Sequence, residues 1–156
     1  MDYPSEDNGF LQEHSKLLYD SYRKLLGKEL ITIDFAHETI AKTMFYGAFA
    51  IVSHNTEIDP IFNYANLKAL ELFGCSWDEF THLPSRLSAE PSHQLERTKL
   101  LAEVSQQGYS HGYQGIRVTK SGRRFLIKNA VVWNLIDSDG CYAGQAACFA
   151  DWEFLS

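Results

Sequence analysis

Residues 61–91 read IFNYANLKALELFGCSWDEFTHLPSRLSAEP, and this stretch holds the most local information about the fold. It opens as a short strand after Pro60. Asn66 is placed to cap a helix over LKALELF, and Gly74 supplies the left-handed residue that ends it. Ser76 and Glu79 have the spacing of a capping box, which starts another helical turn. The stretch therefore predicts a strand followed by two short helices.

The residues before this stretch predict two helices and a strand. Residues 45–53, FYGAFAIVS, are aromatic, β-branched or small, as in a strand with both faces partly covered. A shorter helix is expected between Asp34, which can cap it, and Phe45. The first helix has Asp7 or Asn8 as a cap and Gly27 as its end. Its side chains recur at steps of three and four residues: Phe10, Leu11, His14, Leu17, Leu18, Tyr22 and Leu25.

The residues after it predict one more helix, over 91–107, and then three strands. The strands are YQGIRVT, FLIKNAVVWNLI and YAGQAACFADW, separated by turns at residues 120–123 and 137–140. This order predicts an α+β domain with a five-stranded antiparallel sheet, helices on one face and a preceding N-terminal helical segment. We expect a helical extension over residues 1–44 and the main domain over 45–156, forming a single compact unit.

Composition narrows the functional class. The 156 residues include 14 Lys and Arg against 20 Asp and Glu, so the net charge of −6 argues against nucleic-acid binding. The longest apolar run, at 45–52, is too short to span a membrane, and no signal-peptide pattern opens the sequence. An odd number of cysteines (Cys75, Cys141 and Cys148) is typical of reduced thiols. We expect a cytoplasmic protein with no membrane or nucleic-acid partner.

The element order is that of a PAS domain, and the sequence resembles one family more closely. Residues 61–91, then ERTKLLAEV, GYQGIR, GRRFLIKNAVVWNL and GQAACF, are similar to the MEKHLA domain family, which is PAS-like. Members of that family occur as stand-alone domains in cyanobacteria and other microbes. They also form the C-terminal domain of plant class III homeodomain–leucine-zipper transcription factors. The resemblance implies a non-enzymatic sensory or interaction module that dimerises. The letters MEKHLA and a homeodomain are both absent from this sequence, so DNA binding is not implied.

Flavin-binding light sensors are also PAS domains, and the sequence is similar to them at HLPSRLSA. Ser85 stands where their photoreactive cysteine would be, and Arg86 matches the arginine that holds the flavin phosphate. A serine hydroxyl cannot form the sulfur adduct. The asparagines that bind the flavin ring fall at Arg117 and Ile127, and Gln145 is one residue out of register. We therefore expect no photoactive flavin adduct, and the identity of any cofactor stays open.

Two amides mark a candidate pocket for a small organic ligand. Period-two alternation places Asn129 on an apolar face with Phe125, Ile127, Val131, Trp133 and Leu135. Gln145 shares a face with Cys141, Ala143, Ala147 and Phe149. A buried Asn129 amide needs a partner, which is either a neighbouring strand, the Arg86 loop or a ligand. The small residues around Gln145 either leave room for a ligand or let a helix pack close. Arg86 itself either binds an anion or pairs with Glu79, Glu90 or Glu96. The candidate ligand residues are Ser85, Arg86, Asn129 and Gln145.

Catalytic and metal motifs are not found in the sequence. Ser76 lies in GCSWD, where a capping role explains it better than a nucleophile elbow. The histidines are scattered, and Cys141 and Cys148 are spaced too widely for a zinc motif. His93 is the candidate for a haem ligand. We expect no enzyme; the alternatives are a flavin- or haem-binding sensor and a small enzyme of unknown reaction.

The N-terminal helix has an apolar stripe wide enough to cover part of a sheet. It either caps the sheet of its own chain or pairs with a second copy, and an open antiparallel sheet favours the dimer. In the dimer, Trp133 or Trp152 would be shared between the two copies.

Overall fold

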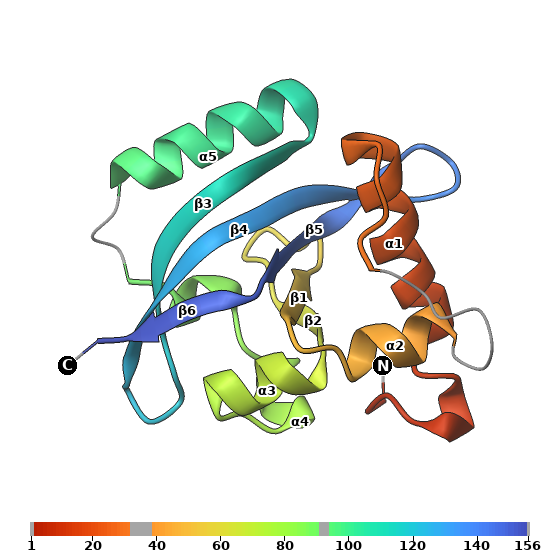
Figure 1. The fold of residues 1–156 in the computed structure, drawn as a ribbon, viewed down its shortest axis with the longest axis horizontal. Helices are drawn as coiled ribbons and strands as arrows, with labels where there is room; N and C mark the ends of the chain where they lie inside the picture. The colour runs from red at the N-terminus through yellow and green to blue at the C-terminus, as the bar shows by residue number, and fades with distance from the viewer. Residues whose placement is uncertain (1, 32–38, 91–93, 156) are drawn as a thin grey trace.

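The computed structural model describes residues 2–31, 39–90 and 94–155 (Figure 1). Its elements, in chain order, are η1 (Glu6–Asn8), α1 (Gln12–Leu26), α2 (Ile40–Phe45), β1 (Ala50–His54), β2 (Phe62–Ala65), α3 (Leu67–Phe73), α4 (Trp77–Phe80), η2 (Ser85–Ser88), α5 (Gln94–Gln107), β3 (Tyr109–Val118), β4 (Arg124–Ile136), β5 (Tyr142–Phe149) and β6 (Asp151–Phe154). The predicted α+β class and the N-terminal helix are confirmed.

The strands form one antiparallel sheet in the order β2-β1-β5-β4-β3, with β6 also pairing with β4. The prediction of five strands was wrong, because the last predicted strand breaks at Ala150 into β5 and β6. Both pieces pair with β4 in one continuous register, since Val131 lies opposite Cys148 and Lys128 lies opposite Asp151. The sheet therefore has six strands, although β5 and β6 together follow one line.

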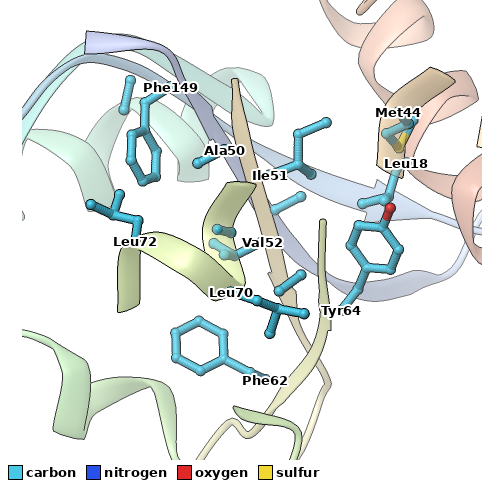
Figure 2. Packing of buried hydrophobic residues seen from close by; sticks show 14 of the residues in the cluster. Leu18, Met44, Ala50, Ile51, Val52, Phe62, Tyr64, Leu70, Leu72 and Phe149 are labelled. Carbon is cyan, nitrogen blue, oxygen red and sulfur yellow. The ribbon is translucent and has the colours of Figure 1, made fainter. Parts of the chain in front are cut away.

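Helices cover both faces of the sheet (Figure 1). We call the face toward α3 and α5 the inner face and the face toward α1 the outer face. Side chains alternate between them along β1, where Ile51 points toward α1 while Ala50 points toward Phe149 and Leu72 (Figure 2). Helices were expected on one face of the sheet. The structure adds α1, which packs on β4 from the other face.

A bulge in β4 corrects the predicted position of Asn129. This residue is exposed and has a φ of +53°, so it adds one residue to the strand and shifts the alternation of side chains. Phe125 accordingly packs against Phe73 of α3 on the inner face, whereas Trp133 packs against Tyr22 of α1 on the outer face. Asparagine is among the few residues besides glycine that adopt this conformation readily. The prediction of one apolar face containing a buried Asn129 was wrong.

Helix α1 is attached to the sheet by packing and by hydrogen bonds. It ends at Gly27, as predicted, but the predicted cap at Asp7 or Asn8 was wrong. The helix begins after Leu11 without a side-chain cap, and Asn8 accepts from the Leu11 amide instead. The Trp133 indole Nε1 donates to the Leu18 carbonyl at 3.2 Å, and the Ser21 hydroxyl accepts from the Ile136 amide at 2.9 Å. Trp133 is fully buried within the chain. The expectation that a partner would share this tryptophan across an open sheet face was therefore wrong.

Two of the predicted helix caps are confirmed and two predicted boundaries move. The Asn66 side chain accepts from the Ala69 amide, and Ser76 and Glu79 form the capping box. Helix α2 includes Phe45 and has Thr39 as its cap, so β1 starts later than predicted. The predicted cap at Asp34 lies outside the described residues, as do the first residues of the predicted 91–107 helix.

Candidate functional site

The four predicted ligand residues lie on three separate elements. Ser85 and Arg86 belong to η2, Asn129 to the β4 bulge and Gln145 to β5. No hydrogen bond of the described residues joins any two of these four side chains. The structure therefore gives each of them its own surroundings instead of bringing them together in one polar site.

Arg86 forms an ion pair with Asp59 in the loop between β1 and β2. Its Nε lies 3.0 Å from Oδ1 and 3.1 Å from Oδ2, and both side chains are about half exposed. The predicted partners are wrong for the described glutamates, because Glu79 pairs with Lys120 and Glu90 with Arg124; the Glu96 side chain lies outside the described part. This ion pair joins η2 to the loop between β1 and β2.

Aromatic rings fill the inner side of the domain between α3, α4 and the sheet. Phe62 stacks on Phe80 with 4.1 Å between ring centroids, and Phe73 lies 5.4 Å from Phe80 and 5.3 Å from Phe125. All four side chains are buried. A bound ring system of flavin size needs a preformed cavity of several hundred cubic ångströms, and these rings would have to leave for one to form.

The residues at the flavin-contacting positions do not fit a flavin either. Ile127 is buried and apolar, and Arg117 donates to the Ile116 carbonyl while its guanidinium lies over the Tyr113 ring. Ser85 is half-buried, and its amide donates to the Pro60 carbonyl. Together with the ion pair of Arg86 and Asp59, these contacts are made between residues of the chain itself.

Gln145 belongs to a row of polar side chains on the inner face. The sequence predicted only Gln145 as a site residue and missed its two neighbours in the row. It lies opposite His54 of β1 and Asn134 of β4, and its Nε2 donates to the Asn134 Oδ1 at 3.3 Å. All three side chains are half-buried. The Gln145 amide is thus bonded to a neighbouring strand of its own sheet.

A second polar cluster lies between α1 and the first hairpin. The Ser53 hydroxyl donates to the Asn63 Oδ1 at 2.5 Å, and the His14 Nε2 lies 2.9 Å from the same hydroxyl. Because the serine proton is engaged with Asn63, His14 has to donate to Ser53. A nucleophilic serine needs the opposite polarity, with the histidine as acceptor. Ser53 is also only 1% exposed, so this pair stabilises the packing of α1 and is not a catalytic centre.

His14 makes folding stability depend on pH. Burial lowers its pKa to about 4 from the ordinary value of 6.5, and its ring stacks on Tyr64. Between these two pKa values the unfolded chain binds more protons than the folded chain, so stability is lost as the pH falls from about 6.5 toward 4. Since His14 is partly exposed, we expect the loss to be on the order of 2 kcal/mol.

Urea denaturation at pH 7 and pH 5 tests this expectation by comparing the protein with His14→Gln. Glutamine keeps an N–H donor for Ser53 but does not titrate. The carboxyls of Glu79 and Glu153, whose pKa values are lowered by Lys120 and Lys128, contribute equally in both proteins and cancel. The variant should lose less stability on acidification; equal losses would contradict the role of His14.

A surface groove of about 610 Å³ lies where the N-terminal segment meets α3 and α4. Apolar and acidic side chains line it, together with Gly74, Cys75 and Ser76. Sequence reasoning missed this groove, because the N-terminal residues that form one wall are far from α3 in the chain. One residue could have indicated the groove from the sequence. Tyr3 is an aromatic residue near the N-terminus, and no nearby residue in the chain is an evident packing partner for it.

Metal ligands do not gather within the described residues. No group of three or more His, Cys, Asp or Glu side chains there is arranged to hold a metal ion. Cys75, Cys141 and Cys148 are free thiols, and the candidate haem ligand His93 lies outside the described part. In that same part, no helix combines the length and apolar character needed to cross a bilayer.

A family model described as the MEKHLA domain matches residues 12–154, from the first residue of α1 to the last residue of β6. The chain belongs to the MEKHLA domain family. Helix α1 lies inside the matched region, so the family pattern includes the element that covers the outer face of this MEKHLA domain.

Relatives of this MEKHLA domain include much longer plant proteins. The homeobox-leucine zipper protein HOX29 of Oryza sativa subsp. indica is 27% identical over 142 residues, which are 86% of this chain and 16% of that protein. The homeobox-leucine zipper protein ATHB-15 of Arabidopsis thaliana is 21% identical over 145 residues, 92% of this chain and 17% of that protein. The chain thus spans about one sixth of the length of these relatives.

Solved structures confirm the PAS fold. The PAS domain of a protein from Colwellia psychrerythraea has a TM-score of 0.59 at 19% identity, covering 74% of this chain and 92% of that one. An RNA-binding light-oxygen-voltage receptor has a TM-score of 0.61 at 16% identity, covering 80% and 36%. The blue-light photoreceptor Vivid has a TM-score of 0.59 at 13% identity, covering 86% and 94%. At these identities the likeness concerns the fold.

Proposed function

We propose that this MEKHLA domain is a non-catalytic, PAS-like regulatory module that acts by contact with another protein chain. The observation that carries the proposal is the packed interior. The phenylalanines of β2, α3, α4 and β4 occupy the inner side, and α1 closes the outer side. A module built in this way has only its surface for signalling. Its setting is the cytoplasm, where its three cysteines would stay reduced.

The same observations bear on the enzymatic alternative. The Ser53–His14 contact is buried and has the wrong polarity for a nucleophile and its base. The relatives with homeobox-leucine zipper names include this domain as about one sixth of their length. A small domain appended to a longer protein is consistent with a regulatory role, and we extend that role to this chain.

A homodimer was expected because of the apolar stripe on α1. That stripe now has a partner within the chain, so a dimer would have to form through another surface. Light scattering on the purified protein measures this directly, by distinguishing a particle of 17.8 kDa from one of twice that mass. Either mass is compatible with a partner-binding module, and a dimer would identify the partner as a second copy.

A small-molecule sensor is the second candidate function, and the row of His54, Asn134 and Gln145 favours it. These half-buried polar groups lie on the inner sheet face and offer hydrogen bonds to an organic ligand. Gln145 already bonds to Asn134, and His54 to the Asn55 carbonyl, which is why we place this function second.

Absorption spectroscopy combined with native mass spectrometry tests the proposal. We expect the freshly purified protein to absorb only in the ultraviolet and to have the mass of its chain or of its dimer. The physical reason is the packing of Phe62, Phe73, Phe80 and Phe125, which occupy the inner side of the domain between α3, α4 and the sheet. Visible absorption bands, or extra mass that is released on denaturation, would contradict the proposal and support the ligand-sensing alternative.

A further inference from the structure

The groove between the N-terminal segment and α3 and α4 has an apolar floor. Leu67 and Leu70 of α3 and Trp77 of α4 contribute to it, together with Tyr3. Leu70 and Trp77 are buried, so the floor belongs to the packed core and keeps its shape without a ligand. Its volume of about 610 Å³ is large enough for two or three side chains of a bound peptide.

Two exposed tyrosines pack against Phe45 of α2, and one of them, Tyr3, lines the groove. Tyr3 is 47% exposed, although its ring makes edge contacts with both Phe45 and Trp77. Tyr46 is 56% exposed and also contacts Phe45. Tyrosines that are held in place and still exposed are the side chains most enriched at protein interfaces, because they offer large contact area at small entropic cost.

The rim of the groove is acidic. Asp2, Glu71 and Asp78 line it, and no lysine or arginine is among its lining residues. Glu71 lies 3.8 Å from Lys68, in a contact between two exposed side chains that screens it only weakly. The chain as a whole has a net charge of −6, which adds to the negative potential around the groove.

From this combination we infer that the groove is the docking site for a short segment of a partner protein that has large apolar side chains between lysines or arginines. The apolar side chains pack against Tyr3 and Leu67, above the buried Leu70 and Trp77, and the cations lie against the carboxylates of the rim. This inference rests on the proposed function and names the chemistry of the partner.

A second copy of this chain is a poor match for the same groove. Its densest group of cations lies at the hairpin between β3 and β4, and these side chains are already engaged. Lys120 pairs with Glu79, Arg124 pairs with Glu90 and Arg123 lies 3.7 Å over the Phe154 ring. Inserting that hairpin into the groove of another copy would break these contacts. In the other basic run, RKLLGK at 23–28, Leu25 and Leu26 pack against the core of their own chain. The partner is therefore a different chain.

Binding of two synthetic peptides to the full chain tests the inference. The probe is the blocked hexapeptide GRLFRG, and its control is GELFEG, which has the same apolar centre and the opposite charge. We expect the basic peptide to bind at least about tenfold more tightly, with an affinity that falls as salt is added. Amide NMR shifts should concentrate at Gly74, Cys75 and Asp78.

Charge-reversal variants localise the effect. Glu71→Lys combined with Asp78→Lys should abolish the preference for the basic peptide. The matched control is Glu13→Lys combined with Asp139→Lys, which changes the net charge equally at exposed positions outside the groove. Equal binding of the two peptides, no binding at millimolar concentration, shifts centred elsewhere, a self-associated dimer that occupies the groove, or equal effects of the two double variants would each overturn the inference. A colourless, ligand-free protein that fails these tests would still satisfy the proposed function.

Discussion

Asn66→Ala is expected to lower the free energy of unfolding by about 3–5 kcal/mol, a large share of the roughly 5–15 kcal/mol that stabilises an ordinary domain. The Asn66 side chain is fully buried and uses all its hydrogen-bonding capacity. Its Oδ1 accepts from the amides of Ile51 and Ala69, and its Nδ2 donates to the carbonyls of Met44 and Phe49. Truncation therefore leaves several backbone groups without a partner in the interior.

Urea denaturation followed by tryptophan fluorescence measures this effect, since Trp77 and Trp133 are buried. Ser76→Ala is the matched control, because Ser76 is also a helix cap but an exposed one whose loss costs about 1 kcal/mol. Asn66→Asp tests the polarity of the site, as it keeps the acceptor and replaces the donor that faces two carbonyls. We expect it to be nearly as destabilising as alanine at pH 7. An Asn66→Ala cost no larger than that of Ser76→Ala would contradict the four-bond role.

Local signals explain why much of the fold could be predicted. The caps at Asn66 and Ser76, the stop at Gly27 and the polar turns between strands act within a few residues of their own position, so the sequence contains them fully. Asn66 also shows the limit. Its cap to Ala69 was predictable, whereas its bonds to Met44, Phe49 and Ile51 depend on how distant segments pack.

The candidate site was predicted less well because its residues were assigned from strand alternation. Alternation assumes an unbroken strand, and the bulge at Asn129 shifts every later side chain of β4 to the other face. The adjacent apolar pair Val131 and Val132 was the available sign of such a shift. Arg86 found its partner in Asp59 of a distant hairpin loop, which no local pattern indicates. The groove similarly needs the N-terminal segment and α4 to meet in space.

The pairing of β1 with β5 holds the two parts of the sheet together. This pairing is what attaches the first hairpin, with α3 and α4 after it, to the β3–β5 meander. Gly144 of β5 lies directly against the end of β1. Its φ is +129°, and a Cβ built on it would lie 2.2 Å from the His54 carbonyl oxygen.

Gly144→Ala is therefore expected to destabilise the protein by at least about 3 kcal/mol, because it combines a disallowed backbone conformation with a clash against backbone that cannot rotate away. Relief requires β1 and β5 to separate. Gly140→Ala is the matched control, since Gly140 also has a positive φ, +81°, but has open space where its Cβ would lie. The control should cost only about 1–2 kcal/mol. Equal urea midpoints for the two variants would show that β1 can shift to admit the methyl group, and the close contact would then not be what fixes the register of the two strands.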